Sequence, residues 1–277
     1  MTGTNGNITT KRRGFRSLAV ALTGFGVLGA AEAYSQPVAQ MKSAASAVIS
    51  GVPTDSPIPV PEDKEGLAVY RAALKARGTK ILISTEARWL WLIMGRDTLV
   101  SAPVAIGMGT TFDYNGKSYE FSTPRGKRLV RLKQENPIWT VPEWHYYEKA
   151  AKRGLEAVHL QPDSPYLLED GTWLDIRDGA VGRVNQFGNW WPFSQDFEII
   201  FEGKIFIPPM NTIQRRVTNA LGPYKLDMGE GYLIHGTHSE NKDSIGQAAS
   251  HGCVRMRNDD LTILYQLVPA GTSVFIF

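Results

Sequence analysis

The chain contains a single cysteine, and the residues around it are types that can activate a thiol. Cys253 lies in the run Ser-His-Gly-Cys-Val-Arg at residues 250–255, and His235 lies earlier in Ile-His-Gly-Thr at residues 234–237. A single thiol cannot form an internal disulfide, whereas a nearby base can convert it into a nucleophilic thiolate. We therefore predict that Cys253 is a nucleophile, with a small buried apolar residue as the alternative.

Histidines are the candidate bases for this thiol. His235 ends a predicted strand and serves if the fold brings it to the cysteine. His251 competes, because on a strand it would share a face with Cys253. Consecutive N–H groups around Gly252 could hold the oxyanion of an acyl-transfer intermediate. The other three histidines lack a motif and are expected in loop, surface or core positions: His145, His159 and His238.

Short β-type runs separated by polar or glycine turns dominate the chain from Lys80 onward. The regular alternation of strands and helices that indicates a parallel α/β sheet is not present. We predict a mainly β fold, a mixed β-sandwich or partly closed sheet with one or two packed helices. The expected strands are 81–84, 89–94, 99–106, 128–132, 198–201, 204–207, 231–235 and 273–277. The expected helices are 143–152 and 259–268, the latter with Asn258 as its N-cap.

The first part of the chain is expected to direct export. Four basic residues between positions 11 and 16 precede an apolar run at 18–31, and Ala31-Glu32-Ala33 offers a cleavage site. Residues 1–33 are therefore predicted to be a signal peptide, with export to the periplasm or cell envelope by the general or the twin-arginine route. An uncleaved signal would instead tether the chain to the membrane. The remaining divisions are a flexible Pro/Ala/Ser tether at 34–60, an N-terminal helix at 61–78 and a catalytic body at 79–277.

The charge of the chain gives no indication of a nucleic-acid partner. The full sequence has 30 basic and 27 acidic residues, and residues 1–33 account for four and one of them. Removal of the predicted signal leaves 26 of each, so the basic balance belongs largely to the signal. No cofactor is expected.

The segments around the thiol and histidine resemble a known enzyme family. Ile-His-Gly-Thr at 234–237, Gly246, and Ser-His-Gly-Cys-Val-Arg-Met at 250–256 are similar to the signature of the L,D-transpeptidase catalytic-domain family, whose members remodel bacterial peptidoglycan. Residues 102–107, 122–126 and 221–226 resemble the family's upstream strand, its Thr-Pro-x-Gly turn and the strand that leads into the histidine. The resemblance covers about residues 79–277 and is weak across 145–205.

This resemblance implies a concrete reaction on peptidoglycan stem peptides. Cys253 would attack the amide before the terminal D-alanine of a tetrapeptide stem, and a diamino-acid side-chain amine of a second stem would accept the acyl group, giving a 3→3 cross-link. His235 would be the general base, oriented by the carbonyl of Gly236, and the N–H groups of His251, Gly252 and Cys253 would form the oxyanion hole. Carbapenem-type inhibitors are expected to acylate the thiol. The implied substrate-binding residues are Ser250, Arg255 and Thr237.

Several alternatives stay open. Water as acceptor would give an L,D-carboxypeptidase, and a lipoprotein lysine would give a lipoprotein-to-wall ligase. His235, His238, His251 and Cys253 could hold the zinc of a peptidase, although the favoured thiol mechanism needs no metal. A chain that kept the fold without turnover would be a wall-binding module. The aromatic segment 145–205, which contains Trp173, Trp190, Trp191 and Phe193, could line a substrate groove or form satellite core under long loops.

Overall fold

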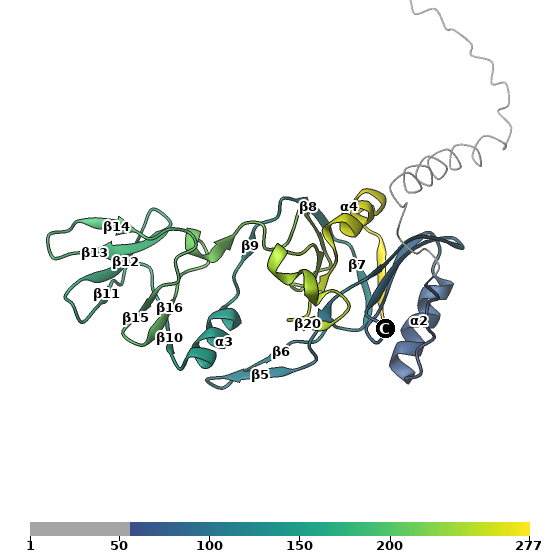
Figure 1. Ribbon diagram of the computed structural model, residues 1–277, viewed down its shortest axis with the longest axis horizontal. Helices are drawn as coiled ribbons and strands as arrows, with labels where there is room; N and C mark the ends of the chain where they lie inside the picture. Colours follow the sequence, from purple (N-terminus) through teal and green to yellow (C-terminus); the bar gives the residue numbers. More distant parts are fainter. Residues whose placement is uncertain (1–55) are drawn as a thin grey trace, which may run out of the picture. The chain divides into compact units, whose positions relative to one another are not determined.

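The computed structural model describes residues 56–277, and this part of the chain is mainly β with three packed α-helices (Figure 1). The predicted fold class is confirmed. The predicted signal peptide at 1–33 and most of the predicted tether lie outside the described residues. Within residues 56–277, no helix combines the length and the apolar character needed to cross a membrane.

A five-stranded sheet forms the first layer, in the order β3-β2-β1-β22-β7. The first three strands form an antiparallel meander, and β22 then joins β1 in parallel. β1 and β2 are almost continuously apolar and buried, as expected for strands covered on both faces. Their bounds are β1 (Thr79–Ser84), β2 (Trp89–Met94), β3 (Asp97–Pro103), β7 (Gly126–Leu129) and β22 (Ser273–Ile276).

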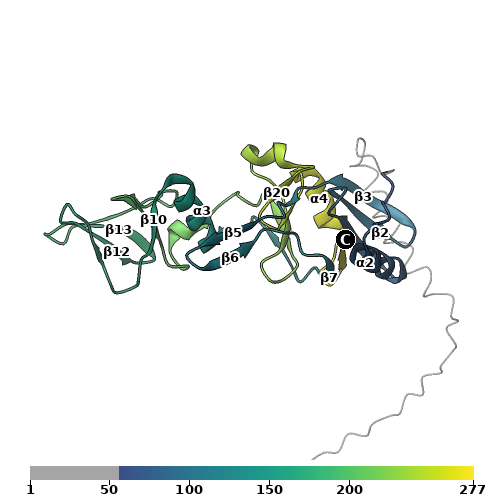
Figure 2. The same cartoon turned by 90° about the horizontal axis from the view of Figure 1, so that it is seen from below.

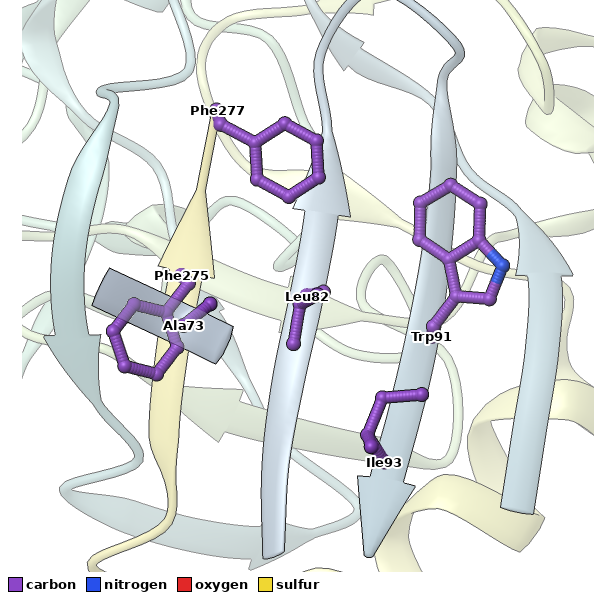
Figure 3. Packing of buried hydrophobic residues seen from close by; sticks show 6 residues of the cluster. All are labelled: Ala73, Leu82, Trp91, Ile93, Phe275 and Phe277. Carbon is purple, nitrogen blue, oxygen red and sulfur yellow. The ribbon is translucent and has the colours of Figure 1, made fainter. Parts of the chain in front are cut away.

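The helix α2 (Lys64–Lys75) packs on one face of this sheet. Leu82 pairs with Trp91 on one side and with Phe275 on the other, so these three side chains share a face. Figure 3 shows them side by side, with Ala73 of the helix lying over Phe275. The Trp91 indole donates to the carbonyl of Ser56 at 2.9 Å, so the end of the predicted tether contacts the sheet.

Both ends of α2 have side-chain partners. The carboxylate of Asp63 accepts the N–H of Gly66 at 2.9 Å, which caps the helix N-terminus. At the other end, the buried ammonium of Lys80 donates to the carbonyls of Ala73 and Ala76 at 2.7 and 2.8 Å. A cation at the carboxyl end of a helix satisfies carbonyls that have no partner within the helix.

A second, four-stranded sheet in the order β21-β19-β18-β8 carries the predicted site. The middle strands β18 and β19 are antiparallel, whereas β19 and β21 are parallel. The strand just before β21 in the chain, β20, pairs in parallel with β4, and α4 packs against β18. Their bounds are β4 (Ile106–Gly107), β8 (Leu132–Glu135), β18 (Tyr224–Asp227), β19 (Leu233–His235), β20 (Ala248–Ser250), β21 (Val254–Arg255) and α4 (Asn258–Leu267).

The segment 145–205 has a hydrophobic core of its own. Figure 2 labels its strands β10, β12 and β13. The segment contains one helix and two small sheets, β10-β16-β15 and β11-β12-β13-β14, with Leu174, Val181 and Phe206 buried among them. A hairpin β5–β6 and a short pair β9–β17 complete the described strands. The bounds are β5 (Thr111–Tyr114), β6 (Lys117–Glu120), β9 (Trp139–Thr140), α3 (Glu143–Arg153), β10 (Glu156–His159), β11 (Tyr166–Leu167), β12 (Trp173–Arg177), β13 (Ala180–Val184), β14 (Trp190–Pro192), β15 (Ile200–Phe201), β16 (Lys204–Ile207) and β17 (Arg216–Val217), with 3-10 turns at Ile213–Arg215 and Ser239–Ser244.

Three local expectations were wrong. The predicted strand 99–106 ends in the first sheet at Pro103 of β3, and Ile106 begins β4 in another sheet. The predicted strand 128–132 is two strands in different sheets, because the N–H of Val130 bonds to Thr272 while the N–H of Arg131 bonds to Asp227. The predicted N-cap Asn258 is instead the first residue of α4, and Arg257 occupies the cap position without a side-chain hydrogen bond. The amide of Asn258 serves the site described next.

Candidate active site

Two parallel strands place the predicted base and the predicted nucleophile in neighbouring segments of the second sheet. In the register of β19 and β21, His235 lies opposite Arg255, and Cys253 directly precedes β21. Directly paired residues project from the same face of a sheet, so His235 and Arg255 share one face. The charge of Arg255 acts on both His235 and the Cys253 thiol.

His235 is buried, with 6% of its surface exposed, and its ring orientation is fixed by one hydrogen bond. Its Nδ1 lies 2.6 Å from the carbonyl oxygen of Gly236. A carbonyl can only accept, so Nδ1 carries the proton and Nε2 is left as the free acceptor. Burial and the charge of Arg255 lower the pKa of His235 to about 4, although the Gly236 carbonyl raises it. The imidazole is therefore neutral near pH 7, as a general base must be.

The backbone after His235 is held by the side chain of Asn258. Its Oδ1 accepts the N–H of Thr237 at 2.9 Å, and its Nδ2 donates to the Thr237 carbonyl at 3.1 Å. A Cβ on Gly236 would lie 2.3 Å from the same Oδ1, so only glycine fits beside this amide. Sequence reasoning found Gly236 through the motif but missed Asn258.

The nucleophile turn, which we define as residues 250–253, is held internally by Ser250. The Ser250 hydroxyl donates to the carbonyl of Cys253 at 2.5 Å and accepts the N–H of Gly252 at 3.1 Å. Gly252 has a φ of +126°, and a Cβ there would lie 3.0 Å from the ring of Tyr232. The turn thus requires glycine. Ser250 is 1% exposed and bonds to backbone, so its side chain supports the turn.

A threonine from the predicted Thr-Pro turn holds the same loop from outside. Thr123 Oγ1 donates to the carbonyl of Gly252 at 2.9 Å and accepts the N–H of Gly107 at 2.8 Å. A Cβ on Gly107 would lie 2.6 Å from backbone atoms of Phe121 and Thr123. Two of the upstream segments that resembled the family therefore meet at the nucleophile turn.

The thiol of Cys253 is partly exposed and is a neutral thiol at rest. Its S–H points to the carbonyl of Gly231, with a distance of 3.7 Å from Sγ to oxygen. Burial raises the pKa of the Cys253 thiol, while the N–H of Leu233 and the charge of Arg255 lower it and Asp227 raises it. The Cys253 thiol and the His235 imidazole are therefore both neutral near pH 7.

Arg255 places a positive charge close enough to act on both groups. Its backbone exchanges two hydrogen bonds of 2.9 Å with Ala105, and its guanidinium donates to the Ala249 carbonyl at 3.4 Å. Burial lowers the pKa of Arg255, and Cys253 raises it. A fixed cation here favours the thiolate over the thiol and the neutral imidazole over imidazolium.

The rival base, His251, is directed to α3. Residues 251–253 are not a strand, so the sequence argument that would have put His251 on the face of Cys253 does not hold. Its ring stacks on Trp144 at 4.2 Å and meets Phe121 edge-on at 4.5 Å, and Nε2 lies 3.3 Å from a carboxylate oxygen of Glu148.

The remaining predicted positions are structural or lie away from the thiol. Thr237 is buried, and its hydroxyl donates to the Met256 carbonyl at 3.4 Å. His145 meets the ring of Trp139 edge-on at 5.3 Å, and burial lowers its pKa to about 4. His159 pairs with a glutamate of α3, and His238 lies in the loop after β19. Within residues 56–277, no three histidine, cysteine, aspartate or glutamate side chains converge as a metal site would require.

For the aromatic residues of the segment 145–205 there were two expectations, the lining of a substrate groove and a satellite core. Phe193 packs against the core of this segment, and the ring of Trp190 occupies the space above Gly182. Trp191 is 52% exposed. Phe193 is therefore satellite core, whereas Trp191 is a surface residue.

Comparison with known proteins decides the family. The model of the L,D-transpeptidase catalytic domain (YkuD) matches residues 78–276. The chain belongs to this family. Among curated relatives, it is 48% identical over 56 residues to the probable L,D-transpeptidase YbiS of Escherichia coli (strain K12), covering 20% of this chain and 18% of the relative. It is 34% identical over 165 residues to the probable L,D-transpeptidase ErfK/SrfK of Salmonella typhimurium, covering 53% and 51%.

The part of this chain that aligns with these two curated relatives thus covers less than two thirds of the length of either relative. Among solved structures, an L,D-transpeptidase from Xylanimonas cellulosilytica aligns with 15% identity and a TM-score of 0.40, over 80% of this chain and 65% of that one. The catalytic domain of the Enterococcus faecium L,D-transpeptidase aligns with 14% identity and a TM-score of 0.38, over 73% and 99%. The predicted family is confirmed by the domain match.

Proposed function

We propose that this chain is a peptidoglycan L,D-transpeptidase that carries the acyl group on Cys253. The observation that supports it most is the state of His235, a buried neutral imidazole whose Nδ1–H is fixed on a carbonyl and whose Nε2 is free to accept a proton. Arg255, which lies opposite His235 in the sheet, acts electrostatically on both His235 and the partly exposed thiol of Cys253. This is the arrangement that a thiol nucleophile and its base require.

In the first half of the reaction, His235 Nε2 takes the thiol proton as Sγ attacks the carbonyl carbon before the terminal D-alanine. The negative charge moves to the carbonyl oxygen, where backbone N–H groups stabilise it. Among the described residues, the N–H groups of His251 and Cys253 donate to no acceptor, whereas that of Gly252 donates to Ser250. We assign the N–H groups of His251 and Cys253 as the principal donors to this oxygen. The N–H of Gly252 becomes a third donor if its hydrogen bond to the Ser250 hydroxyl breaks.

The tetrahedral intermediate then collapses. The carbon–nitrogen bond breaks, the imidazolium of His235 returns its proton to the leaving amine, and D-alanine departs from a thioester on Cys253. In the second half, a stem amine attacks the thioester carbon, His235 accepts a proton from it, and the thiolate leaves and is reprotonated. The product is a 3→3 cross-link.

Acylation is tested with a carbapenem, whose β-lactam carbonyl is open to thiol attack. Intact-protein mass spectrometry is expected to show a covalent adduct on the wild type and none on Cys253→Ser. His235→Ala is expected to lose nearly all acylation by the peptide donor, and His159→Ala, on a different strand, should keep the wild-type rate. A wild type that forms no adduct contradicts the proposal.

The acceptor is tested with purified disaccharide-tetrapeptide. A dimer that lacks one D-alanine supports cross-linking, whereas tripeptide alone indicates water as the acceptor and an L,D-carboxypeptidase. Transfer to a lipoprotein lysine requires a separate incubation with that protein.

Export of the chain is also part of the proposal. It rests on the basic, apolar and small-residue pattern of residues 1–33 and on the location of peptidoglycan outside the cytoplasm. Fractionation followed by N-terminal sequencing checks it: the mature chain should be in the envelope fraction and begin after Ala33.

A further inference from the structure

We propose that Glu148 and Trp144 are positioning residues for the nucleophile turn, and that α3 holds the His251 imidazole so that the backbone of residues 251–253 faces the substrate. The proposal rests on the proposed function, because it concerns the turn that presents Cys253. It assigns a role to a helix that belongs to the weakly matching segment of the chain.

Three side chains enclose the His251 ring. Trp144 stacks on one face at 4.2 Å and 24°, and Phe121 meets the ring edge-on at 4.5 Å and 83°. Glu148 accepts from Nε2 at 3.3 Å, with 18% of its side chain exposed against 24% for the histidine. A ring held on a face, an edge and its polar tip has little rotational freedom left.

The His251 side chain anchors the turn from outside. Ser250 and Thr123 hold Gly252 and Cys253 through hydrogen bonds to their backbone. The peptide before His251 is held at its carbonyl, where Ser250 accepts the N–H of Met108 at 2.9 Å, whereas the N–H of His251 donates to no acceptor among the described residues. The next residue is a glycine at a φ of +126°, a conformation that other residues rarely adopt. The enclosed ring of His251 therefore adds a side-chain anchor where the turn otherwise has only backbone hydrogen bonds.

The helix itself is anchored away from the site. Glu198 binds Lys149 and, at 2.7 Å, Arg153, which lie on α3 after Glu148. Gly154 ends the helix with a φ of 65°, and the helix packs against β10 and β16. The contacts that locate His251 therefore depend on the fold of residues 143–207.

The charges around His251 favour a neutral ring that donates to a carboxylate. Burial lowers the pKa of His251, Glu148 raises this pKa, and Arg255 and Lys152 lower it. His145, which like Glu148 lies on α3, is also close to the His251 ring. Although burial raises the pKa of Glu148, its bond with Lys152 and the neighbouring His251 bring it below its usual value. The pair at neutral pH is an Nε2–H donor and an ionised acceptor.

A second carboxylate–histidine pair, whose carboxylate also lies on α3, provides a matched control. Glu143 accepts from His159 at 3.2 Å and is also close to Lys117, but neither partner belongs to the nucleophile turn. Glu148→Ala is expected to lower the rate of acylation by a carbapenem about tenfold with the concentration dependence unchanged, because it misplaces the turn without touching the ligand. Glu148→Gln keeps an acceptor and should restore the rate to within about twofold of the wild type.

Two readouts separate positioning from folding. Glu143→Ala should acylate at the wild-type rate, and histidine NMR of Glu148→Gln should show the His251 titration moved to lower pH, because the carboxylate that raises its pKa is gone. The inference is overturned if Glu148→Ala acylates like the wild type, if Glu143→Ala is equally slow, or if the His251 titration does not move. A wild type that forms no adduct refutes the proposed function instead, and the NMR result still decides whether Glu148 holds His251.

Discussion

His235 should make the folded chain sensitive to acid well before the carboxylates are protonated. Its pKa is lowered to about 4 in the folded state from a usual value of 6.5. The unfolded chain therefore binds a proton at this residue between these two values and the folded chain does not. Stability is fully present above the unfolded pKa and is lost as the pH falls toward the folded one.

The size of the effect follows from the two pKa values. One pKa unit corresponds to about 1.4 kcal/mol, so the free energy of unfolding should fall by about 2 kcal/mol between pH 7 and about pH 5. The loss should reach about 3 kcal/mol near pH 4 and then stop growing, because both states are then protonated. This contribution is specific to one residue and disappears when the imidazole is replaced.

Urea unfolding of the wild type and of His235→Gln provides the assay. The variant lacks the titrating group, so the stability difference between the two proteins should shrink by about 2 kcal/mol between pH 7 and about pH 5. The acylation rate should rise with pH with an apparent pKa that belongs to the coupled Cys253–His235 pair. A stability difference that is the same at every pH would refute the buried neutral imidazole, and with it the assignment of His235 as base.

Two further substitutions test the nucleophile turn. Gly252→Ala places a Cβ against the ring of Tyr232 at a backbone φ of +126°. We expect the acylation rate to fall about 100-fold, while a small alkylating reagent still modifies the thiol. An unchanged acylation rate would contradict the need for glycine. Thr123→Val removes both bonds of the hydroxyl and leaves the N–H of Gly107 buried without a partner, so thermal unfolding should show a loss of about 1–3 kcal/mol that Thr123→Ser largely restores. If valine and serine behave alike, the two hydrogen bonds do not hold the loop.

Local pattern predicted the strands that are buried and regular. The expected run 89–94 has the same bounds as β2, and 204–207 has those of β16. In the turn between β15 and β16, Glu202 and Gly203 both have a positive φ, as a tight hairpin requires. In each case the alternation of side chains and the turn residues lie within a few positions of one another.

Pairing between distant segments could not be predicted in the same way. Residues 128–132 look like one strand, and only the hydrogen bonds of Val130 and Arg131 to different sheets show that the chain crosses over there. The strands β10–β14 were missed because they are short, contain glycine and proline, and lie in a small separate core.

In the candidate site, too, local motifs were predictable and contacts between distant segments were not. The motif located Cys253, His235 and Gly236, since their types and spacing carry the chemistry. It did not show that Asn258 would hold the backbone after the histidine, or that Glu148 would meet His251 from 103 positions away. Polar side chains such as these have no local pattern, because their function depends on a partner that the fold supplies.

The position of β22 has a consequence for the order of folding. It is inserted between β1 and β7, and Lys80 of β1 pairs with Ser273 across about 190 intervening residues. Until residues 273–276 have been synthesised, β1 has one open edge and α2 has no complete surface to cover. The strand β1 must therefore wait for β22, and this long loop closure makes the five-stranded sheet a late and slow step of folding.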